Sequence, residues 1–246
     1  MGQKIRMIFP VPLSDETRGL IESQVPESLV NSPDFEVEFV GSKRMMSLAN
    51  SYYDLYIMEA ICLEAGLKAQ DDGCAAVCIN TVSDSALYAL RSRLSIPVIA
   101  PGQAAFHTAC MLGHKFSILT MWAPWIPMYE KTLKEYGLTH RLASIRHINT
   151  RPDVEELLMG KEDIVFGKLE EQGLAAIEED GAEVIVIGST TMHQSHAYLA
   201  KKLPVPVINP GVLAYKLCEM LIALGLSHSK LAFPDPELLQ DEALFP

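Results

Sequence analysis

Short apolar runs recur along the chain and alternate with segments in which apolar residues are spaced three and four apart. Continuous apolar runs of this length are typical of strands buried on both faces, and the wider spacing is typical of helices with one face in a core. Leu55, Met58 and Ile61 show the helical spacing. The predicted strands cover residues 5–10, 35–41, 74–80, 97–102, 116–121, 142–148, 183–189 and 204–211. Because strands and helices alternate, the pattern predicts an α/β protein with parallel sheets.

The chain also carries an internal repeat with a period of about 110 residues, far longer than a solenoid repeat and typical of a duplicated half-protein. Three ordered pairs of segments match. They are residues 4–10 with 115–121, 72–81 with 180–189, and 97–102 with 206–211. The repeat predicts two pseudo-symmetric, doubly wound α/β domains, each with a parallel four-stranded sheet. We expect residues 1–101 with 211–246 to form the first domain and residues 102–210 the second.

The duplication indicates where a ligand would bind. In open parallel sheets, ligands bind beyond the carboxyl ends of the strands. Thr81 and Ser189 occupy matched positions at such ends, one in each half. If the halves face each other across a pseudo-twofold axis, both residues approach one cleft from opposite sides. We therefore expect the active site in a cleft between the two domains.

Charge and apolar content exclude several classes of function. The chain has 246 residues and a net charge of −11, which disfavours nucleic acid as a partner because that affinity rests on clustered positive charge. No apolar run reaches the ~20 residues of a membrane-spanning helix, and the N-terminal segment lacks a signal-peptide core. We expect a cytoplasmic protein with no membrane contact. No phosphate-binding or dinucleotide-binding glycine motif occurs, so we expect no cofactor.

The cysteines and histidines do not indicate a metal site. Five cysteines in a chain without an export signal disfavour a disulfide framework. Cys74 and Cys78 lie in one apolar run, where ~3.3 Å per residue would hold their side chains about 13 Å apart, too far to share a zinc ion. His193 and His196 form an HxxH pair without a third ligand at a familiar spacing. We therefore expect no metal.

The order and spacing of several motifs resemble the aspartate/glutamate/hydantoin racemase superfamily, especially its hydantoin-racemase-like branch. The motifs are SYYD (51–54), DDGCAAVCINTVSDSALYALR (71–91), SIPVIAPGQAAFH (95–107), EEDGAEVIVIGSTTM (178–192) and VPVINPG (205–211). The resemblance implies two pseudo-symmetric α/β domains, a small-molecule substrate and a homo-oligomer of two or more copies. It also implies one cysteine at each of two strand ends. One thiolate removes a proton next to a carbonyl, and the other thiol delivers a proton from the far side.

The chain departs from the family's pattern at both of these positions, where it has Thr81 and Ser189. A hydroxyl is a much weaker acid than a thiol and needs a partner base. His193 lies four residues after Ser189 and is the candidate partner, since its unperturbed pKa is ~6.5. With these three as catalytic residues, we expect an enzyme that acts on a hydantoin-like cyclic amide or ureide, or a small carboxylate, by hydrolysis or elimination. Two alternatives stay open: a hydantoin or amino-acid racemase or isomerase with bases other than cysteine, and a non-catalytic binding protein.

Other candidates for substrate contact lie near predicted strand ends and helix starts. Hydroxyl and backbone N–H groups there bind a carboxylate, an imide or an oxyanion, and Ser and Thr also cap helices. Aromatic residues near strand ends either close over a ring-shaped substrate or pack in the core. The expected substrate-binding residues are Pro10, Val11, Ser51, Tyr53, Asn80, Val82, Phe106, Thr120, Trp122, Thr190, Thr191 and Asn209.

Overall fold

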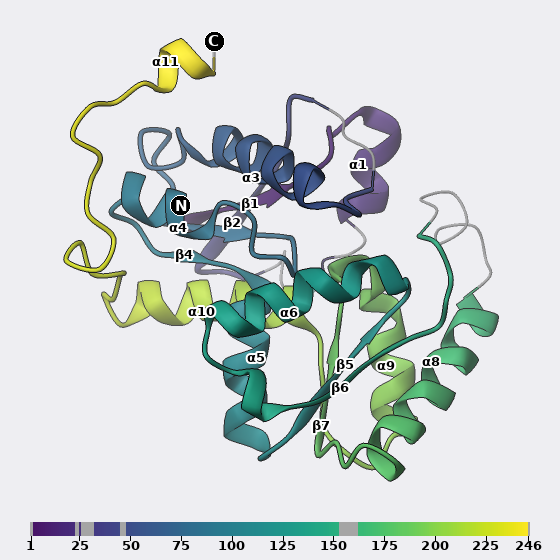
Figure 1. The fold of residues 1–246 in the computed structure, drawn as a ribbon. Coiled ribbons are helices and arrows are strands. Elements are labelled where there is room, and N and C mark those ends of the chain that lie inside the picture. Colours follow the sequence, from purple (N-terminus) through teal and green to yellow (C-terminus); the bar gives the residue numbers. More distant parts are fainter. Residues whose placement is uncertain (1, 23–24, 26–31, 45–47, 153–161, 246) are drawn as a thin grey trace. The chain divides into compact units, whose positions relative to one another are not determined.

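The chain divides into two units, Met1–Ala100 with Ala214–Pro246, and Pro101–Leu213. The computed structural model describes residues 2–22, 25, 32–44, 48–152 and 162–245 (Figure 1). Each unit contains one four-stranded sheet in which all strands are parallel. The predicted α/β class with a duplicated parallel sheet is therefore confirmed.

In the first unit the strand order is β2-β1-β3-β4. The strands are β1 (Gln3–Phe9), β2 (Phe35–Gly41), β3 (Ala76–Ile79) and β4 (Val98–Ile99). The helices are α1 (Asp15–Glu22), α3 (Tyr52–Gly66), α4 (Leu87–Arg93), α11 (Asp241–Leu244) and the greater part of α10 (Pro210–Ala223).

The core of the first unit lies between its sheet and the helices that follow the strands. Ile8 of β1 and Val77 of β3 belong to one buried cluster with Cys62 of α3 and Leu90 of α4. The Cys218 thiol of α10 donates to the carbonyl oxygen of Val77 at 3.6 Å. Apolar side chains and this thiol contact thus fasten α3, α4 and α10 to the central strands.

In the second unit the strand order is β6-β5-β7-β8. The strands are β5 (Phe116–Thr120), β6 (Leu142–His147), β7 (Val184–Ile187) and β8 (Val207–Ile208). The helices are α5 (Pro101–Leu112), α6 (Ile126–Glu135), α8 (Glu162–Glu178) and α9 (His193–Lys202), with short 3-10 helices η1 (Ala123–Trp125), η2 (Thr139–Arg141) and η3 (Thr190–Met192).

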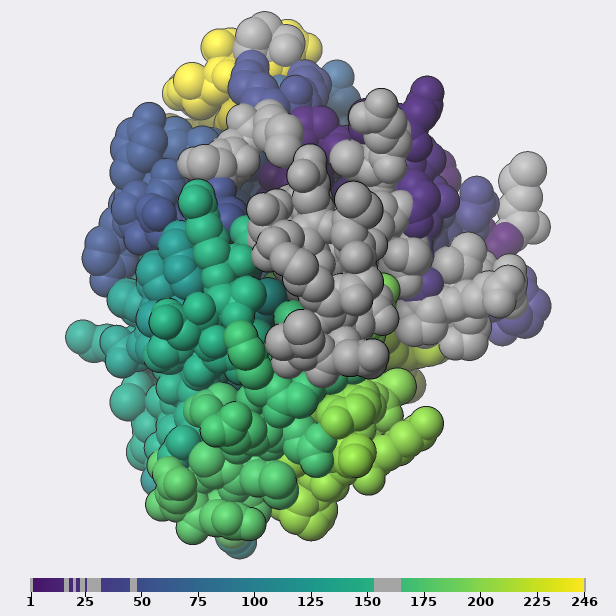
Figure 2. Space-filling model, turned by 90° about the vertical axis from the view of Figure 1, so that its right-hand side faces the viewer, coloured from purple at the N-terminus to yellow at the C-terminus, as the bar shows by residue number. Residues whose placement is uncertain are grey.

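The strands of the second unit lie between α5 on one side and α8 and α9 on the other (Figure 1). Leu119 of β5, Leu169 of α8 and Leu199 of α9 belong to one buried cluster. Phe106 of α5 stacks on Phe116 of β5, with ring centroids 5.7 Å apart. Parts of α8 and α9 lie next to each other on the surface (Figure 2). Helices α5, α8 and α9 thus each bury apolar side chains against the sheet of this unit.

The two units repeat the same hydrogen bond at the carboxyl end of the third strand. In the first unit the Asn80 N–H donates to the carbonyl oxygen of Ile8 at 2.9 Å. In the second unit the Gly188 N–H donates to the carbonyl oxygen of Leu119 at 2.7 Å. Asn80 and Gly188 are matched residues of the sequence repeat, so the duplication extends to single backbone contacts.

The last strand of each sheet is shorter than predicted. The runs 97–102 and 204–211 form two-residue strands, because Pro101 and Pro210 are the first residues of α5 and α10. Proline suits the first turn of a helix, where its missing N–H has no partner to lose. Among the residues whose placement is described, no helix is long and apolar enough to cross a membrane.

Candidate functional site

Ser189 lies two residues beyond the end of β7 and starts the short helix η3. Its hydroxyl oxygen accepts the N–H of Thr191 at 3.3 Å, which makes it the N-cap of that helix. The hydroxyls of Ser189 and Thr191 are also within 2.8 Å of each other. Ser189 is half-buried and Thr191 exposed, so the capping role leaves the pair open to solvent on one side.

Tyr129 of α6 supports this strand end from the core. Its buried hydroxyl donates to the carbonyl oxygen of Gly188 at 2.6 Å. The Thr120 hydroxyl lies 3.0 Å from the phenol oxygen and must donate to it, since the single phenol proton is already used. Burial raises the pKa of Tyr129, against the smaller opposing effect of the Thr120 bond, so the phenol stays a proton donor.

Thr120, which we expected to contact substrate, is fully buried. Its hydroxyl pairs with Tyr129, so it supports the strand end from within the core. Phe106 is also fully buried, stacked on Phe116. The structure therefore corrects both expectations, because neither side chain reaches a surface where a ligand could touch it.

His193 is the first residue of α9 and is half-buried. Three residues later, Nε2 of His196 lies 3.1 Å from the carbonyl oxygen of Val207 in β8. This contact gives His196 a structural role in fastening α9 to the sheet. Among the residues that the structure describes, no group of three or more His, Cys, Asp or Glu side chains is arranged to hold a metal ion.

Thr81 lies two residues beyond the end of β3, at the position matched to Ser189. Its side chain is buried, and its hydroxyl oxygen accepts the N–H of Ser85 at 3.2 Å. Its carbonyl oxygen accepts the N–H of Asp84 at 3.0 Å. These bonds close a tight loop directly after the strand, so Thr81 holds the start of this loop in place.

The loop after Thr81 holds two residues in the left-handed region of the backbone. Asp84 has φ 54° and Ala86 has φ 68°, a conformation that strains residues with a Cβ by about 1–2 kcal/mol. The Ala86 N–H donates to Oε2 of Glu59 in α3 at 2.5 Å, and the hydroxyls of Ser83 and Ser85 are 3.0 Å apart. Strain of this kind persists where surrounding contacts over-determine the backbone, as they do at many functional sites.

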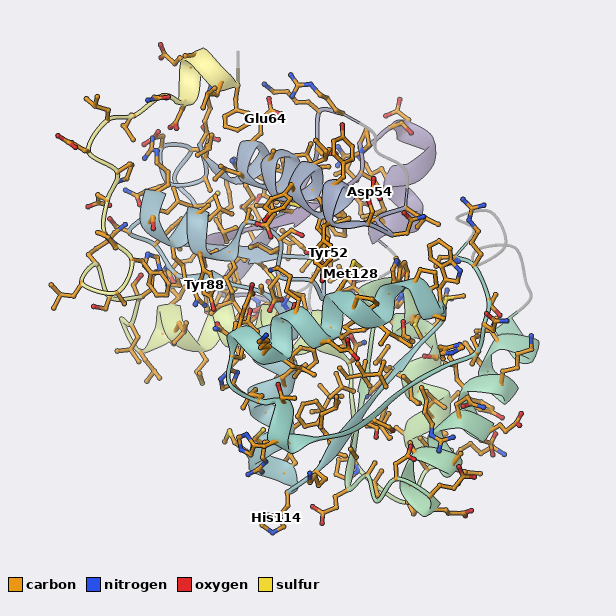
Figure 3. All side chains as sticks on the ribbon, in the orientation of Figure 1. Tyr52, Asp54, Glu64, Tyr88, His114 and Met128 are labelled. Atoms are coloured by element: carbon orange, nitrogen blue, oxygen red, sulfur yellow. The ribbon has the colours of Figure 1, made fainter. Side chains whose placement is uncertain are left out.

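Helix α3 is the next described helix after β2 along the chain, and Ser51 is its N-cap. The Ser51 hydroxyl accepts the Asp54 N–H at 3.2 Å and donates to Oδ2 of Asp54 at 2.6 Å. The bonds from Ser51 and from the Asn50 backbone lower the pKa of Asp54. Tyr52 and Tyr53 are exposed, and Tyr52 and Asp54 are labelled at this helix start in Figure 3. Ser51 therefore caps the helix, while substrate contact by Ser51 and Tyr53 stays a prediction.

Six further predicted residues lie within three positions after the end of a strand, at the edge of the sheet that the carboxyl ends of its parallel strands share. Pro10 and Val11 follow β1 and are half-buried, and Val82 follows β3 and is buried. In the second unit, Thr190 is buried after β7, and Asn209 follows β8 with its Oδ1 3.4 Å from the Val212 N–H. The buried Asn80 lies beside Thr81 at the edge of the first sheet. The structure thus brings these residues to the same edges as Thr81 and Ser189.

Trp122 is half-buried just after β5. It packs edge-on against Trp125, with ring centroids 6.3 Å apart. The Arg151 guanidinium carbon lies 5.8 Å from the centroid of the Trp122 ring. Trp122 thus has an aromatic and a cationic neighbour, and its contact with substrate stays a prediction.

The sequence did not indicate Tyr129, Glu59 or Ala86 as parts of these edges. Tyr129 and Gly188 are 59 residues apart, and Glu59 and Ala86 are 27 apart. No local pattern marks such pairs. One available signal was Gly188 itself, since a glycine directly before a strand-end hydroxyl indicates a close backbone approach.

Comparisons with known proteins agree on one family. The family described as Asp/Glu/Hydantoin racemase matches residues 17–218. The chain is 31% identical over 230 residues to a hydantoin racemase of Pseudomonas sp. (strain NS671), covering 93% of this chain and 89% of that protein. Its structure resembles an allantoin racemase from Klebsiella pneumoniae (TM-score 0.85, 29% identity, 100% of both chains). It also resembles an allantoin racemase from Pseudomonas fluorescens (TM-score 0.83, 26% identity, 96% of this chain and 98% of that one).

Proposed function

Because this chain belongs to the Asp/Glu/hydantoin racemase family, we propose that it racemises a small cyclic ureide of the hydantoin or allantoin type. Allantoin and hydantoins substituted at C5 have a ureide ring whose stereocentre, C5, carries a hydrogen next to a carbonyl. The chain's likeness to a hydantoin racemase and to allantoin racemases supports racemisation better than the hydrolysis or elimination that its two hydroxyls suggested. Racemisation, one of the two alternatives that the sequence leaves open, is therefore the preferred reaction.

The matched placement of Thr81 and Ser189 is the structural observation that carries the proposal. Each lies two residues beyond the equivalent strand of its sheet, at the positions where the resemblance implies proton-transferring residues. Each hydroxyl is held by a backbone N–H that donates to it. A hydroxyl oriented in this way keeps its own proton available for donation. The placement supports one proton-transfer role for each hydroxyl.

In the proposed reaction, the C–H bond next to the carbonyl breaks and its electron pair moves onto the carbonyl oxygen. The proton passes to the protein, and a second proton then re-forms the C–H bond on the opposite face. As the second proton adds, the electron pair returns from the oxygen and the C=O bond re-forms, so the reaction has no net change in bonding and needs no co-reactant. Because a hydroxyl is a weak acid, each relays the proton to a partner base. We assign His193 as the partner of Ser189 and the buried Asp84 as the partner of Thr81.

The test is proton NMR and polarimetry of single enantiomers of hydantoins and allantoin in D2O. The wild-type protein should bring optical rotation to zero, exchange the hydrogen at the stereocentre for deuterium, and open no ring. Thr81→Ala and Ser189→Ala should each lower the racemisation rate by about 10²-fold or more. Thr139→Ala, which removes an exposed threonine hydroxyl from η2, is the control and should leave the rate unchanged.

Each other result contradicts a stated part of the proposal. A ring-opened product would restore the hydrolase reading, and binding without exchange or rotation change would show a non-catalytic binding protein. Full activity in both alanine variants would refute the roles of Thr81 and Ser189. The expected homo-oligomer and the cytoplasmic location stay predictions.

A further inference from the structure

Gly188 is the residue through which the core reaches Ser189. Its carbonyl oxygen accepts the Tyr129 hydroxyl at 2.6 Å, and its N–H donates to Leu119 at 2.7 Å. Both polar groups of this glycine are therefore held from within the second unit. A Cβ on Gly188 would lie 2.8 Å from the Tyr129 hydroxyl and 2.9 Å from the Leu119 oxygen. Only glycine fits between these two partners without displacing one of them.

The bond from Tyr129 acts directly on the peptide that leads into Ser189. The Gly188 carbonyl and the Ser189 nitrogen and Cα belong to one planar, trans peptide unit. Holding the carbonyl oxygen therefore fixes the plane from which the Ser189 side chain projects. The Thr120 hydroxyl, 3.0 Å from the phenol oxygen, holds the phenol in turn. Thr120, Tyr129 and Gly188 are all buried, so water does not compete for these bonds.

We infer that Tyr129 is a positioning residue for Ser189, fixing through the Gly188 carbonyl the direction in which the Ser189 hydroxyl points. This inference rests on the proposed function for its catalytic consequence. Tyr129 does not touch the substrate. Its bond limits the rotation of the peptide before Ser189, and displacing a reacting group by about 1 Å slows catalysis by about 10²-fold.

The test compares Tyr129→Phe, which removes only the phenol oxygen, with Thr132→Val. Thr132 lies on the same helix and is buried, but its hydroxyl bonds to Met128 one turn earlier. Tyr129→Phe should lower kcat for racemisation about 10-fold or more with little change in KM, because the contacts to the substrate remain. Thr132→Val should leave both constants close to wild type. Equal losses in the two variants would overturn the inference.

A double-mutant cycle separates positioning from general loss of structure. If Tyr129 acts through Ser189, Tyr129→Phe should slow the Thr81→Ala variant but have no further effect in the Ser189→Ala variant. A residue with only a structural role would lower the rate by the same factor in both backgrounds. Equal factors would therefore refute the inference while leaving the racemase proposal intact.

A readout independent of activity covers the case in which the wild-type protein does not racemise any compound tested. Hydrogen–deuterium exchange of the backbone amides in residues 188–192 should become about 10-fold faster in Tyr129→Phe than in Thr132→Val. Unchanged exchange would overturn the positioning role. If Tyr129→Phe does not fold, Thr120→Val replaces it in the test. This variant removes the hydrogen bond between the Thr120 hydroxyl and the Tyr129 phenol and should give smaller changes in the same direction.

Discussion

The close packing around Gly188 predicts that adding a single methyl group at this position lowers the stability of the protein substantially. In Gly188→Ala, the new Cβ would lie 2.8 Å from the Tyr129 hydroxyl, 2.9 Å from the Leu119 carbonyl oxygen and 3.1 Å from Cγ2 of Ile118. The Leu119 oxygen is backbone inside the sheet, and the phenol is held in the core by two hydrogen bonds. Neither neighbour moves away without breaking a contact.

The expected loss follows from these contacts. Overpacking a tight interior site lowers the free energy of unfolding by about 1–3 kcal/mol. Displacing the phenol weakens its bond to Gly188, which adds about 1 kcal/mol. The total of about 2–4 kcal/mol corresponds to a fall in Tm of about 5–15 °C for a chain of this size.

Thermal and urea unfolding, followed by far-UV circular dichroism, measure this loss. The matched control is Gly167→Ala, because Gly167 lies in α8 and a Cβ there meets nothing within 4 Å. That substitution should raise the free energy of unfolding by about 0.5–1 kcal/mol, since alanine is the better helix former. The two variants carry the same change in composition and should move Tm in opposite directions.

A Tm for Gly188→Ala within about 1 °C of wild type would refute this reasoning. A further check is the double variant Gly188→Ala/Tyr129→Phe, in which the phenol oxygen no longer opposes the methyl group. Its loss of stability should be smaller than the sum of the two single losses. Strict additivity would show that the Tyr129 contact does not limit the space at Gly188.

Two further predictions concern the first unit. Ala86→Val should lower the free energy of unfolding by about 2 kcal/mol, because a β-branched residue is strained at φ 68°. The control, Ala200→Val on the exposed side of α9, should lower it by only about 0.5 kcal/mol. Equal midpoints of urea unfolding for the two variants would contradict the strain at Ala86. Burial, with the nearby charges of Lys230 and Arg91, lowers the pKa of His228 despite its bond to Leu94. Its neutral form is therefore favoured in the folded state, and stability is lost as pH falls below about 6.5. Limited proteolysis should cut the segment after His228 faster at acid pH in the wild-type protein than in His228→Gln, and equal pH dependence would refute the role of this side chain.

The proposed reaction differs from the one that the chemistry of single residues favours. Thr81 and Ser189 suggested hydrolysis or elimination, because hydroxyls are poor bases on their own. Likeness along nearly the whole chain supports racemisation instead. The order and spacing of motifs across the chain identified the family, which the chemistry of two side chains could not do.

The amino-acid sequence by itself determined the alternation of strands and helices, the duplication, and the placement of Thr81 and Ser189 beyond matched strands. The strands and helices follow from local periodicity, and the duplication follows from aligning the two halves of the sequence with each other. Only the tertiary structure decided that Phe106 and Thr120 belong to the core and that Ala86 adopts a left-handed conformation held by Glu59. It alone also brought Tyr129 to Gly188. Periodicity reports which face of an element is buried, whereas such contacts depend on which distant elements pack together, and no local pattern encodes that pairing.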